Sequence, residues 1–328
     1  MKLSRFMGRA VAHYYSGRDP FGQRGDFITA PEISQMFGEI IGLWAAVVWQ
    51  MLGSPSELIL AELGPGRGTL MADLLRAAVT LPGFRQALRV HLVETSPSLR
   101  QRQGQTLGET AVTWLDAIEQ LPPGPAIIVA NEFFDALPID QYVRRADGWH
   151  ARLVANGEGF HFVDGAVVED IGFPECELGE IFEVNQPARE VAAWLGRRFG
   201  ESAGAALIID YGHAQSAAGD TLQAVGKHQA VSALSDPGEV DLTAHVDFAA
   251  LARAAAPAAS SGVVTQGAFL RRLGIELRAA RLAAARPDQA ADIETACQRL
   301  INPRGMGTLF KVMALSSAGL TELPGFNA

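Results

Sequence analysis

A glycine-rich turn with a carboxylate in front of it is the segment of this chain best suited to chemistry. Residues 58–63 form an apolar run interrupted only by Glu62, and Gly64, Gly66 and Gly68 follow at alternate positions. Glycine has no Cβ, so such a turn can bend sharply and let the backbone approach a ligand closely. Apolar residues then recur at helical spacing. We predict a strand, a tight turn and a helix that together hold a nucleotide cofactor.

The spacing of the glycines separates two kinds of cofactor. A dinucleotide fingerprint reads G-x-G-x-x-G, whereas this segment reads E-x-G-x-G-x-G, and Thr69 stands where the third glycine of the fingerprint would fall. The pattern resembles the first motif of the class I methyltransferases, which use S-adenosylmethionine. A plain β-α turn would also explain an isolated glycine triplet, so other residues must decide.

Two further acids end predicted strands. Glu94 closes the strand expected over residues 88–94, where an acid after a glycine loop can accept hydrogen bonds from ribose hydroxyls. The connection from Gly68 to Glu94 is longer than usual, which makes Asp116, after the strand at 111–115, the next candidate. An exposed acid at a strand end is the alternative interpretation of Glu94.

The apolar run at residues 126–130 ends in Asn-Glu-Phe-Phe-Asp-Ala-Leu-Pro. Open α/β sheets bind ligands at the carboxyl ends of their central strands. We therefore expect function to concentrate at residues 131–138, with Asn131 near the cofactor. Phe133 and Phe134 could line an acceptor pocket or pack in the core. Thr29, Pro31 and Glu32 could cover the cofactor or simply begin a helix.

The order of these elements predicts an α/β fold with a main sheet of seven strands. Short alternating segments between residues 139 and 168, separated by Asp-Gly and Asn-Gly turns, indicate an antiparallel meander, and a helix follows at 187–199. We predict an N-terminal helical cover over 1–52, a core formed by 53–138 and 205–328, and an insertion at 139–204 that binds substrate.

Composition excludes several classes of function. The formal net charge of −9 is the wrong sign for a nucleic-acid-binding protein, which needs a basic face. Two cysteines are too few for a zinc site or a disulfide framework, so we expect no metal. The longest apolar stretch is shorter than the roughly 20 residues that span a bilayer, and we expect no membrane insertion.

Several further motifs, together with those above, resemble the MidA family of S-adenosylmethionine-dependent methyltransferases. The likeness extends from Tyr14 to Met313. The additional motifs lie at residues 25–34, 37–39, 210–212, 221–224, 241–248 and 265–267. The resemblance implies the seven-stranded methyltransferase fold, with the glycine loop at Gly64, Gly66 and Gly68 and the ribose acid at Glu94. It also implies a protein substrate, because mitochondrial members methylate an arginine on a subunit of respiratory complex I.

An arginine acceptor would give the acids after residue 130 a specific role. Its guanidinium is a poor nucleophile with a pKa above 12, and a pair of carboxylates can hold two nitrogens and leave the third to react. Glu132 and Asp135 are the candidates, unless Asp135 caps a turn and Glu132 is merely solvated. Asp210, and Asp241 with His245, rank second. His245 can take up a proton near neutral pH, or serve only in capping or packing.

Two other functions fit the same sequence. Methylation of a small oxygen or nitrogen acceptor is possible because a fold does not fix a substrate. An assembly chaperone that binds the cofactor for stability would present the meander and the segment at residues 37–52 to a partner. The expected compartment is the cytoplasm of a bacterium or the mitochondrial matrix of a eukaryote. The oligomeric state and the number of methyl groups stay open.

Overall fold

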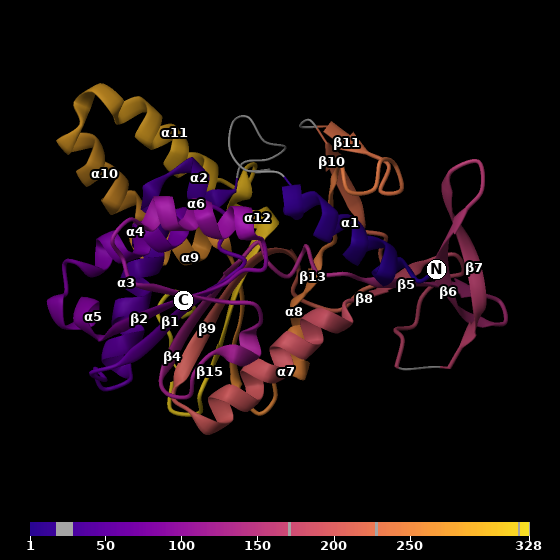
Figure 1. Cartoon of the computed structure of the whole chain (residues 1–328), viewed down its shortest axis with the longest axis horizontal. Helices are drawn as coiled ribbons and strands as arrows, with labels where there is room; N and C mark the ends of the chain where they lie inside the picture. The colour runs from indigo at the N-terminus through magenta and orange to yellow at the C-terminus, as the bar shows by residue number, and fades with distance from the viewer. Residues whose placement is uncertain (18–28, 170–171, 227–228, 321, 328) are drawn as a thin grey trace.

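The computed structural model of the 328-residue chain describes residues 1–17, 29–169, 172–226, 229–320 and 322–327. Residues 25–28, the first part of the motif at 25–34, lie outside the described residues. Figure 1 shows a large sheet covered by helices on one side of the molecule and smaller antiparallel sheets on the other.

The main sheet has the predicted seven-strand path, in the order β14-β15-β9-β4-β1-β2-β3. Strands β1, β2, β3, β4 and β9 pair in parallel, whereas β15 runs antiparallel to both of its neighbours. A short strand, β13 (Val246–Asp247), adds to the end of β9. The bounds are β1 Leu58–Leu63, β2 Leu88–Val93, β3 Val112–Leu115, β4 Ala126–Asn131, β9 Gly204–His213, β14 Ala259–Thr265 and β15 Phe310–Ser316. The predicted fold class is confirmed.

Both faces of this sheet are buried, because side chains alternate along each strand. On β1, Leu58 and Leu60 join one hydrophobic cluster, and Ile59 and Leu63 join a second cluster on the opposite face. Helices cover both faces, which explains why the central strands read as continuous apolar runs. The helices are α3 Gln35–Met51, α4 Thr69–Ala78, α9 Gln266–Arg272, α10 Ile275–Ala285 and α11 Ala290–Ile301 on the first face, and α7 Gln186–Glu201 and α8 Phe248–Ala254 on the second.

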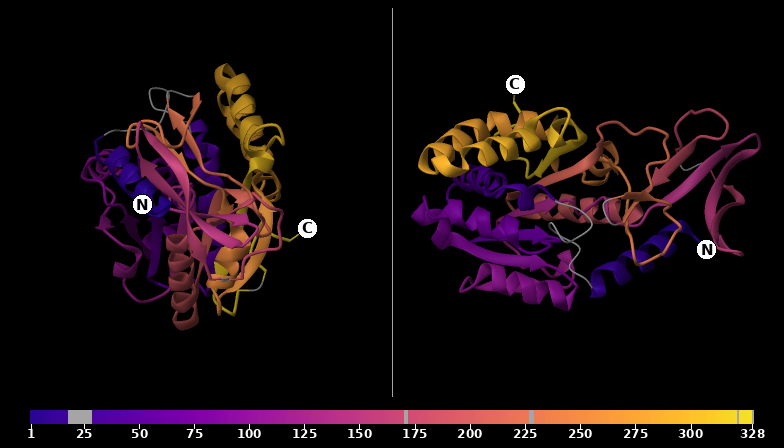
Figure 2. Two further views of the ribbon diagram at one scale, coloured as in Figure 1. Left: turned by 90° about the vertical axis from the view of Figure 1, so that its right-hand side faces the viewer. Right: turned by 90° about the horizontal axis from the view of Figure 1, so that it is seen from above.

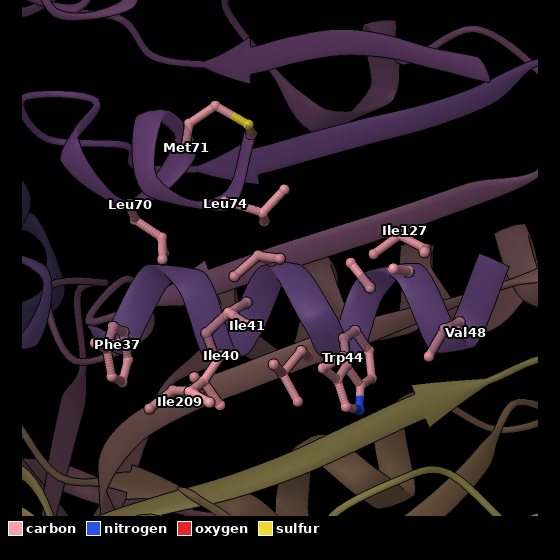
Figure 3. Close-up of a cluster of buried hydrophobic side chains, with 14 of the residues drawn as sticks. Phe37, Ile40, Ile41, Trp44, Val48, Leu70, Met71, Leu74, Ile127 and Ile209 are labelled. Atoms are coloured by element: carbon pink, nitrogen blue, oxygen red, sulfur yellow. The ribbon is translucent and has the colours of Figure 1, made fainter. Parts of the chain in front are cut away.

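Helix α3 belongs to the core rather than to a cover. Phe37, Ile40, Ile41, Trp44 and Val48 are each 0 or 1% exposed. In Figure 3 they lie between α4 and the sheet. The expected cover over residues 1–52 is therefore divided, since α3 packs inside while α1 (Leu3–Gly17) lies elsewhere.

Helix α1 packs against the antiparallel sheets. Its buried residues Leu3, Phe6 and Met7 form one cluster with Val154 and Leu242, which belong to two different sheets. One sheet has the order β7-β6-β5-β8 and the other β11-β10-β12. Figure 2 shows this part of the molecule extending away from the main sheet. The strands are β5 Asp140–Arg145, β6 Gly148–Asn156, β7 Phe160–Val168, β8 Ile181–Val184, β10 Gln223–Gly226, β11 Gln229–Val231 and β12 Asp241–Thr243.

The remaining helices are short, apart from α6. They are α2 Ala30–Ile33, α5 Pro82–Ala87, α6 Pro97–Leu107 and α12 Met306–Leu309. Helix α6 begins after Ser96, whose hydroxyl caps it by accepting a hydrogen bond from Leu99 N at 3.5 Å. Within the described residues, no helix combines the length and the apolar character that crossing a bilayer requires.

Candidate active site at the carboxyl ends of the strands

A cavity of about 670 Å³ opens where β1, β2 and β4 end. Its walls come from the glycine loop, the start of α6, the turn after β4 and the start of α2, with residues of β9, β10 and β12 facing them. Of the residues predicted from the sequence, the cavity wall contains Glu62, Gly64, Gly66, Glu94, Asn131, Glu132, Asp135 and His245. Gly68, Asp116 and Asp210 do not line it.

The glycine loop requires its glycines. Gly64, Gly66 and Gly68 have φ values of 60°, 51° and 79°, in the left-handed region that side chains with a Cβ rarely adopt. A Cβ on Gly64 would also lie 3.0 Å from Cδ2 of Phe133. Gly68 precedes α4 as its N-cap residue, which explains why it supports the loop without lining the cavity.

Glu62 leaves an unsatisfied acceptor at the floor of the cavity. Its side chain is buried, and burial raises the pKa of its carboxyl to about 8. Among the described residues, Glu62 Oε2 has no hydrogen-bond partner. A buried polar atom in this condition usually has a ligand or water as its partner, so Glu62 fits a donor or cationic group in the cavity.

Glu94 is held in place from three directions. Ser96 N donates to Glu94 Oε1 at 2.7 Å, Gln103 Nε2 donates to Glu94 Oε2 at 3.3 Å, and Arg100 Nε donates to the main-chain oxygen of Glu94 at 2.7 Å. Burial raises the pKa of the Glu94 carboxyl. Asp116 instead is exposed and forms a 2.7 Å ion pair with Arg100 outside the cavity wall.

Gln103 on α6 connects the acid with the glycine loop, and we did not predict it. Its Nε2 also donates to Gly66 O at 2.8 Å, and its Oε1 accepts from Trp114 Nε1 at 2.8 Å. The side chain is fully buried. Helix α6 is polar along most of its length, so its sequence gives no sign that this glutamine differs from its neighbours.

The turn after β4 holds Glu132 in a strained conformation. Its φ is +50°, which a glutamate rarely adopts, and such strain is often found at functional sites. Glu132 Oε1 accepts hydrogen bonds from Ala30 N at 3.3 Å and Asn131 Nδ2 at 3.2 Å. Burial, and then the charge of Asp135, raise the pKa of the Glu132 carboxyl to about 8.

Asp135 lines the same cavity and is 5% exposed. Burial raises the pKa of its carboxyl to about 6, and a hydrogen bond from the Tyr211 hydroxyl opposes that rise. Asp135 Oδ1 has no hydrogen-bond partner within the described part of the chain. Like Glu62, it offers a free acceptor to a bound group.

Asp210 lies behind the cavity wall rather than in it. Its carboxylate is fully buried and accepts hydrogen bonds from Phe134 N at 3.0 Å, Asp135 N at 3.2 Å and Tyr211 N at 2.9 Å. Burial, and then the charges of Asp135 and Glu132, hold the pKa of Asp210 well above its usual range. This placement suits a residue that fixes the backbone of the turn.

The facing wall contains His245, Tyr211, Thr243 and Asp241. Burial, and then the charges of His213 and Lys311, lower the pKa of His245, which favours a neutral imidazole at pH 7. Tyr211 belongs to the motif at residues 210–212, and we predicted no role for it.

The two aromatic residues of the turn after β4 have different environments. Phe133 lines the cavity and its ring contacts that of Phe134, with centroids 5.2 Å apart. Phe134 itself is fully buried in the core. The ring of Phe133 therefore faces the cavity, and the ring of Phe134 packs in the hydrophobic core.

Helix α2 closes part of the cavity above the glycine loop. Thr29, Pro31 and Glu32 line the wall, so this segment both begins a helix and covers the site. Glu32 Oε1 accepts a 2.5 Å hydrogen bond from Thr69 Oγ1, and Glu32 Oε2 lies 3.4 Å from Arg67 Nη1.

Comparisons with known proteins identify the family. The family model described as "Putative S-adenosyl-L-methionine-dependent methyltransferase" matches residues 40–267. The chain belongs to this methyltransferase family. It is 36% identical to protein arginine methyltransferase NDUFAF7, mitochondrial, of Danio rerio, over 98% of this chain and 85% of that protein. It is 34% identical to the Homo sapiens protein of the same name, over 92% of this chain and 76% of the relative.

A solved structure supports the same assignment. A Burkholderia thailandensis protein crystallised with S-adenosyl-homocysteine superposes with a TM-score of 0.86 at 30% sequence identity, covering 99% of this chain and 90% of that one. The predicted cofactor, S-adenosylmethionine, is therefore that of the family, and the cavity fits it. Glu62 offers an unpaired acceptor to a cationic or donor group, Glu94 lines the cavity directly after β2, and the glycines carry no side chain that would keep a ligand away from the backbone.

Proposed function

We propose that this methyltransferase is a protein arginine N-methyltransferase whose substrate is a subunit of respiratory complex I. The observation that carries the proposal is the pair Glu132 and Asp135, which line one cavity together with the glycine loop. The names of the relatives described above support an arginine acceptor. The resemblance to the MidA family supports complex I.

The two carboxylates suit a guanidinium in number and in charge. A planar guanidinium can donate to two carboxylates at once, which concentrates electron density on the nitrogen that stays free. Burial raises the pKa of both carboxyls, and the charge of Asp135 raises that of Glu132 further, so a bound cation would favour the ionised forms of both. The turn that carries them is fixed by Asp210, so the pair is preorganised before an acceptor arrives.

When bound, S-adenosylmethionine would supply a methyl group from a positively charged sulfonium: the S–CH3 bond breaks and leaves neutral S-adenosyl-homocysteine, while the accepting nitrogen forms one N–C bond and releases one proton. The role of Glu132 and Asp135 is to hold and orient the guanidinium, and an ionised Glu132 carboxylate can accept that proton. Glycine-loop residues and Glu94 hold the donor on the other side of the cavity. The chain thus contributes alignment and electrostatic stabilisation.

Replacing both acids by amides tests the proposal. The double variant Glu132→Gln with Asp135→Asn should bind S-adenosyl-homocysteine within about twofold of the wild type but lose at least about 100-fold in methyl transfer to an arginine peptide, because its neutral amides no longer hold a cation. Binding is measured by calorimetry and transfer by radiolabel. Each single variant should lose much of the activity.

A control with the same change of charge is available on the surface. Glu119 and Asp288 are exposed acids outside the cavity, so Glu119→Gln with Asp288→Asn should retain full activity. A peptide with lysine in place of arginine should accept methyl poorly, because an ammonium does not match a planar clamp. Equal labelling of the two peptides, or full activity of the Glu132 and Asp135 double variant, would contradict the arginine mechanism.

The inserted sheet is our candidate for recognition of the protein substrate. The sheet within residues 140–184 is linked to the cavity wall by hydrogen bonds: Glu183 on β8 accepts from Thr221 N at 3.0 Å, and Thr221 Oγ1 accepts from His245 N at 2.8 Å. In a eukaryotic cell the enzyme would work in the mitochondrial matrix, and in a bacterium in the cytoplasm. Mass spectrometry of complex I subunits with and without the gene would identify the methylated residue.

A further inference from the structure

Tyr211 has contacts that no role in cofactor binding explains. Its hydroxyl donates a hydrogen bond to the Asp135 carboxylate and accepts one from the Thr243 side chain. The ring is held on two sides, by His245 with centroids 5.5 Å apart and by Phe310 with centroids 5.6 Å apart, both edge-on. The side chain lines the cavity and has little freedom to turn.

Neighbouring residues at the end of β9 hold different parts of Asp135. The Asp210 carboxylate accepts a hydrogen bond from the main-chain N–H of Asp135, and the Tyr211 hydroxyl donates one to the Asp135 side chain. Asp135 Oδ1 is left without a hydrogen-bond partner among the described residues, although the side chain is 95% buried. One oxygen of the Asp135 carboxylate is held by a hydrogen bond, and the other is buried without a partner. A buried oxygen in this condition is suited to accept a hydrogen bond from a bound group.

We infer that Tyr211 is a positioning residue for methyl transfer, whose hydroxyl holds the Asp135 carboxylate so that its free oxygen receives the acceptor guanidinium. The inference rests on the proposed function, since it takes Asp135 as a ligand of the acceptor. Burial of the phenol, and then the charge of Asp135, keep the pKa of Tyr211 far above its usual value, so the hydroxyl remains a donor throughout the working pH range.

The hydrogen bond also sets the ionisation of Asp135. Its carboxyl is surrounded by Glu132 on the same turn, Asp210 and Tyr211 on β9, and Asp241 on β12. Of these groups, the acids favour its protonated form and Tyr211 favours its ionised form. Removing the hydroxyl should therefore raise the pKa of Asp135 above about 6.

The variant Tyr211→Phe tests this inference. We expect kcat for an arginine peptide to fall about tenfold, the acid limb of the profile of kcat/KM against pH to move to higher pH, and the affinity for S-adenosyl-homocysteine to stay within about twofold. Carboxyl-carbon NMR of ¹³C-labelled aspartate should show the same upward shift for Asp135. Thr295→Val, which removes an exposed hydroxyl on α11 away from the cavity wall, is the control and should change none of these quantities.

A double-mutant cycle separates positioning from general destabilisation. If Tyr211 acts through Asp135, then Tyr211→Phe should cause no further loss in the Asp135→Asn background. An unchanged pH profile and NMR titration, or losses that multiply in the cycle, would overturn the inference while leaving arginine methylation intact. Failure of the wild-type enzyme to label arginine would overturn the proposed function first, and the role of Tyr211 with it.

Discussion

At the scale of single residues, the site gathers acids whose ionised forms are disfavoured by burial. Glu62, Glu132, Asp135 and Asp210 all have raised pKa values, with burial as the main cause. The cost of burying these groups is offset when a cation or a hydrogen-bond donor is bound. Perturbed acids that line a cavity are typical of a functional site.

Glu62 gives a pH dependence of stability that can be measured without substrate. Its pKa is 4.5 in the unfolded chain and about 8 when folded, so between these pH values the folded state keeps a proton that the unfolded state has lost. The free energy of unfolding should fall as pH rises through this window, by up to about 1.4 kcal/mol per pH unit for this group. Glu62→Gln should flatten the decline in Tm between pH 6 and 8, whereas Glu57→Gln, in an exposed acid, should not. Parallel curves for wild type and Glu62→Gln would contradict the assignment.

At the scale of elements, the sequence predicted what depends on local pattern. The seven strands and the meander appear as apolar or alternating runs with glycine turns between them, and the helix predicted at 187–199 is α7, Gln186–Glu201. Strand β8 and the sheet of β10, β11 and β12 were missed because short strands of three or four residues show no clear alternation. Strands β10 and β12 pack against α1, and β8 pairs with β5, so their formation depends on tertiary contacts.

The site was predictable where a motif follows a strand and not where residues converge from distant segments. Glu62, Glu94 and Glu132 stand at strand ends, which the topology places at one edge of the sheet. Gln103 and Tyr211 act through contacts with Gly66 and Asp135. Asp116 ends a strand as well, but β3 is the edge strand, and its acid faces Arg100 on the surface.

The glycine loop yields a prediction for the element that holds the donor. Gly66→Val places a β-branched side chain at φ +51° where the backbone faces the cavity, and binding of S-adenosyl-homocysteine should become undetectable by calorimetry. Gly53→Val is the matched control, because Gly53 has φ +81°, no atom within 4 Å of its Cβ position and no place in the cavity wall. It should lose stability but keep its affinity. Wild-type affinity in a folded Gly66→Val protein would disprove our placement of the donor.

At the scale of the whole molecule, one acidic cavity lies between two structurally different parts. The main sheet contributes the glycine loop and the acids at the strand ends, while β10 and β12 close the cavity from the side of the antiparallel sheets. Helix α1 packs between those sheets and contributes Val11 and Ala12 to the wall. An acceptor would therefore meet side chains from both parts at once.

The charge of the molecule and of its cavity predicts a preference among substrates. The net charge is −9, and the carboxylates in the wall belong to Glu32, Glu62, Glu94, Glu132, Asp135 and Asp241. Arg67 also lines the wall, where it forms an ion pair with Glu32. Glu62 and Glu132, with pKa values of about 8, are mostly protonated at pH 7, so it is the net charge of the molecule rather than these two acids that should attract basic peptides and raise their association rate.

We therefore expect an arginine peptide flanked by lysines to be a better substrate than the same peptide flanked by glutamates. Its kcat/KM should fall about tenfold when ionic strength rises from 0.01 to 0.15 M, since the Debye length shortens from about 30 to about 8 Å. At saturating peptide the rate should change little, because chemistry within the cavity is poorly screened. Initial rates at several salt concentrations measure both quantities. Rates independent of salt, or faster reaction of the glutamate-flanked peptide, would mean that contacts with the inserted sheet, rather than the field of the molecule, select the substrate.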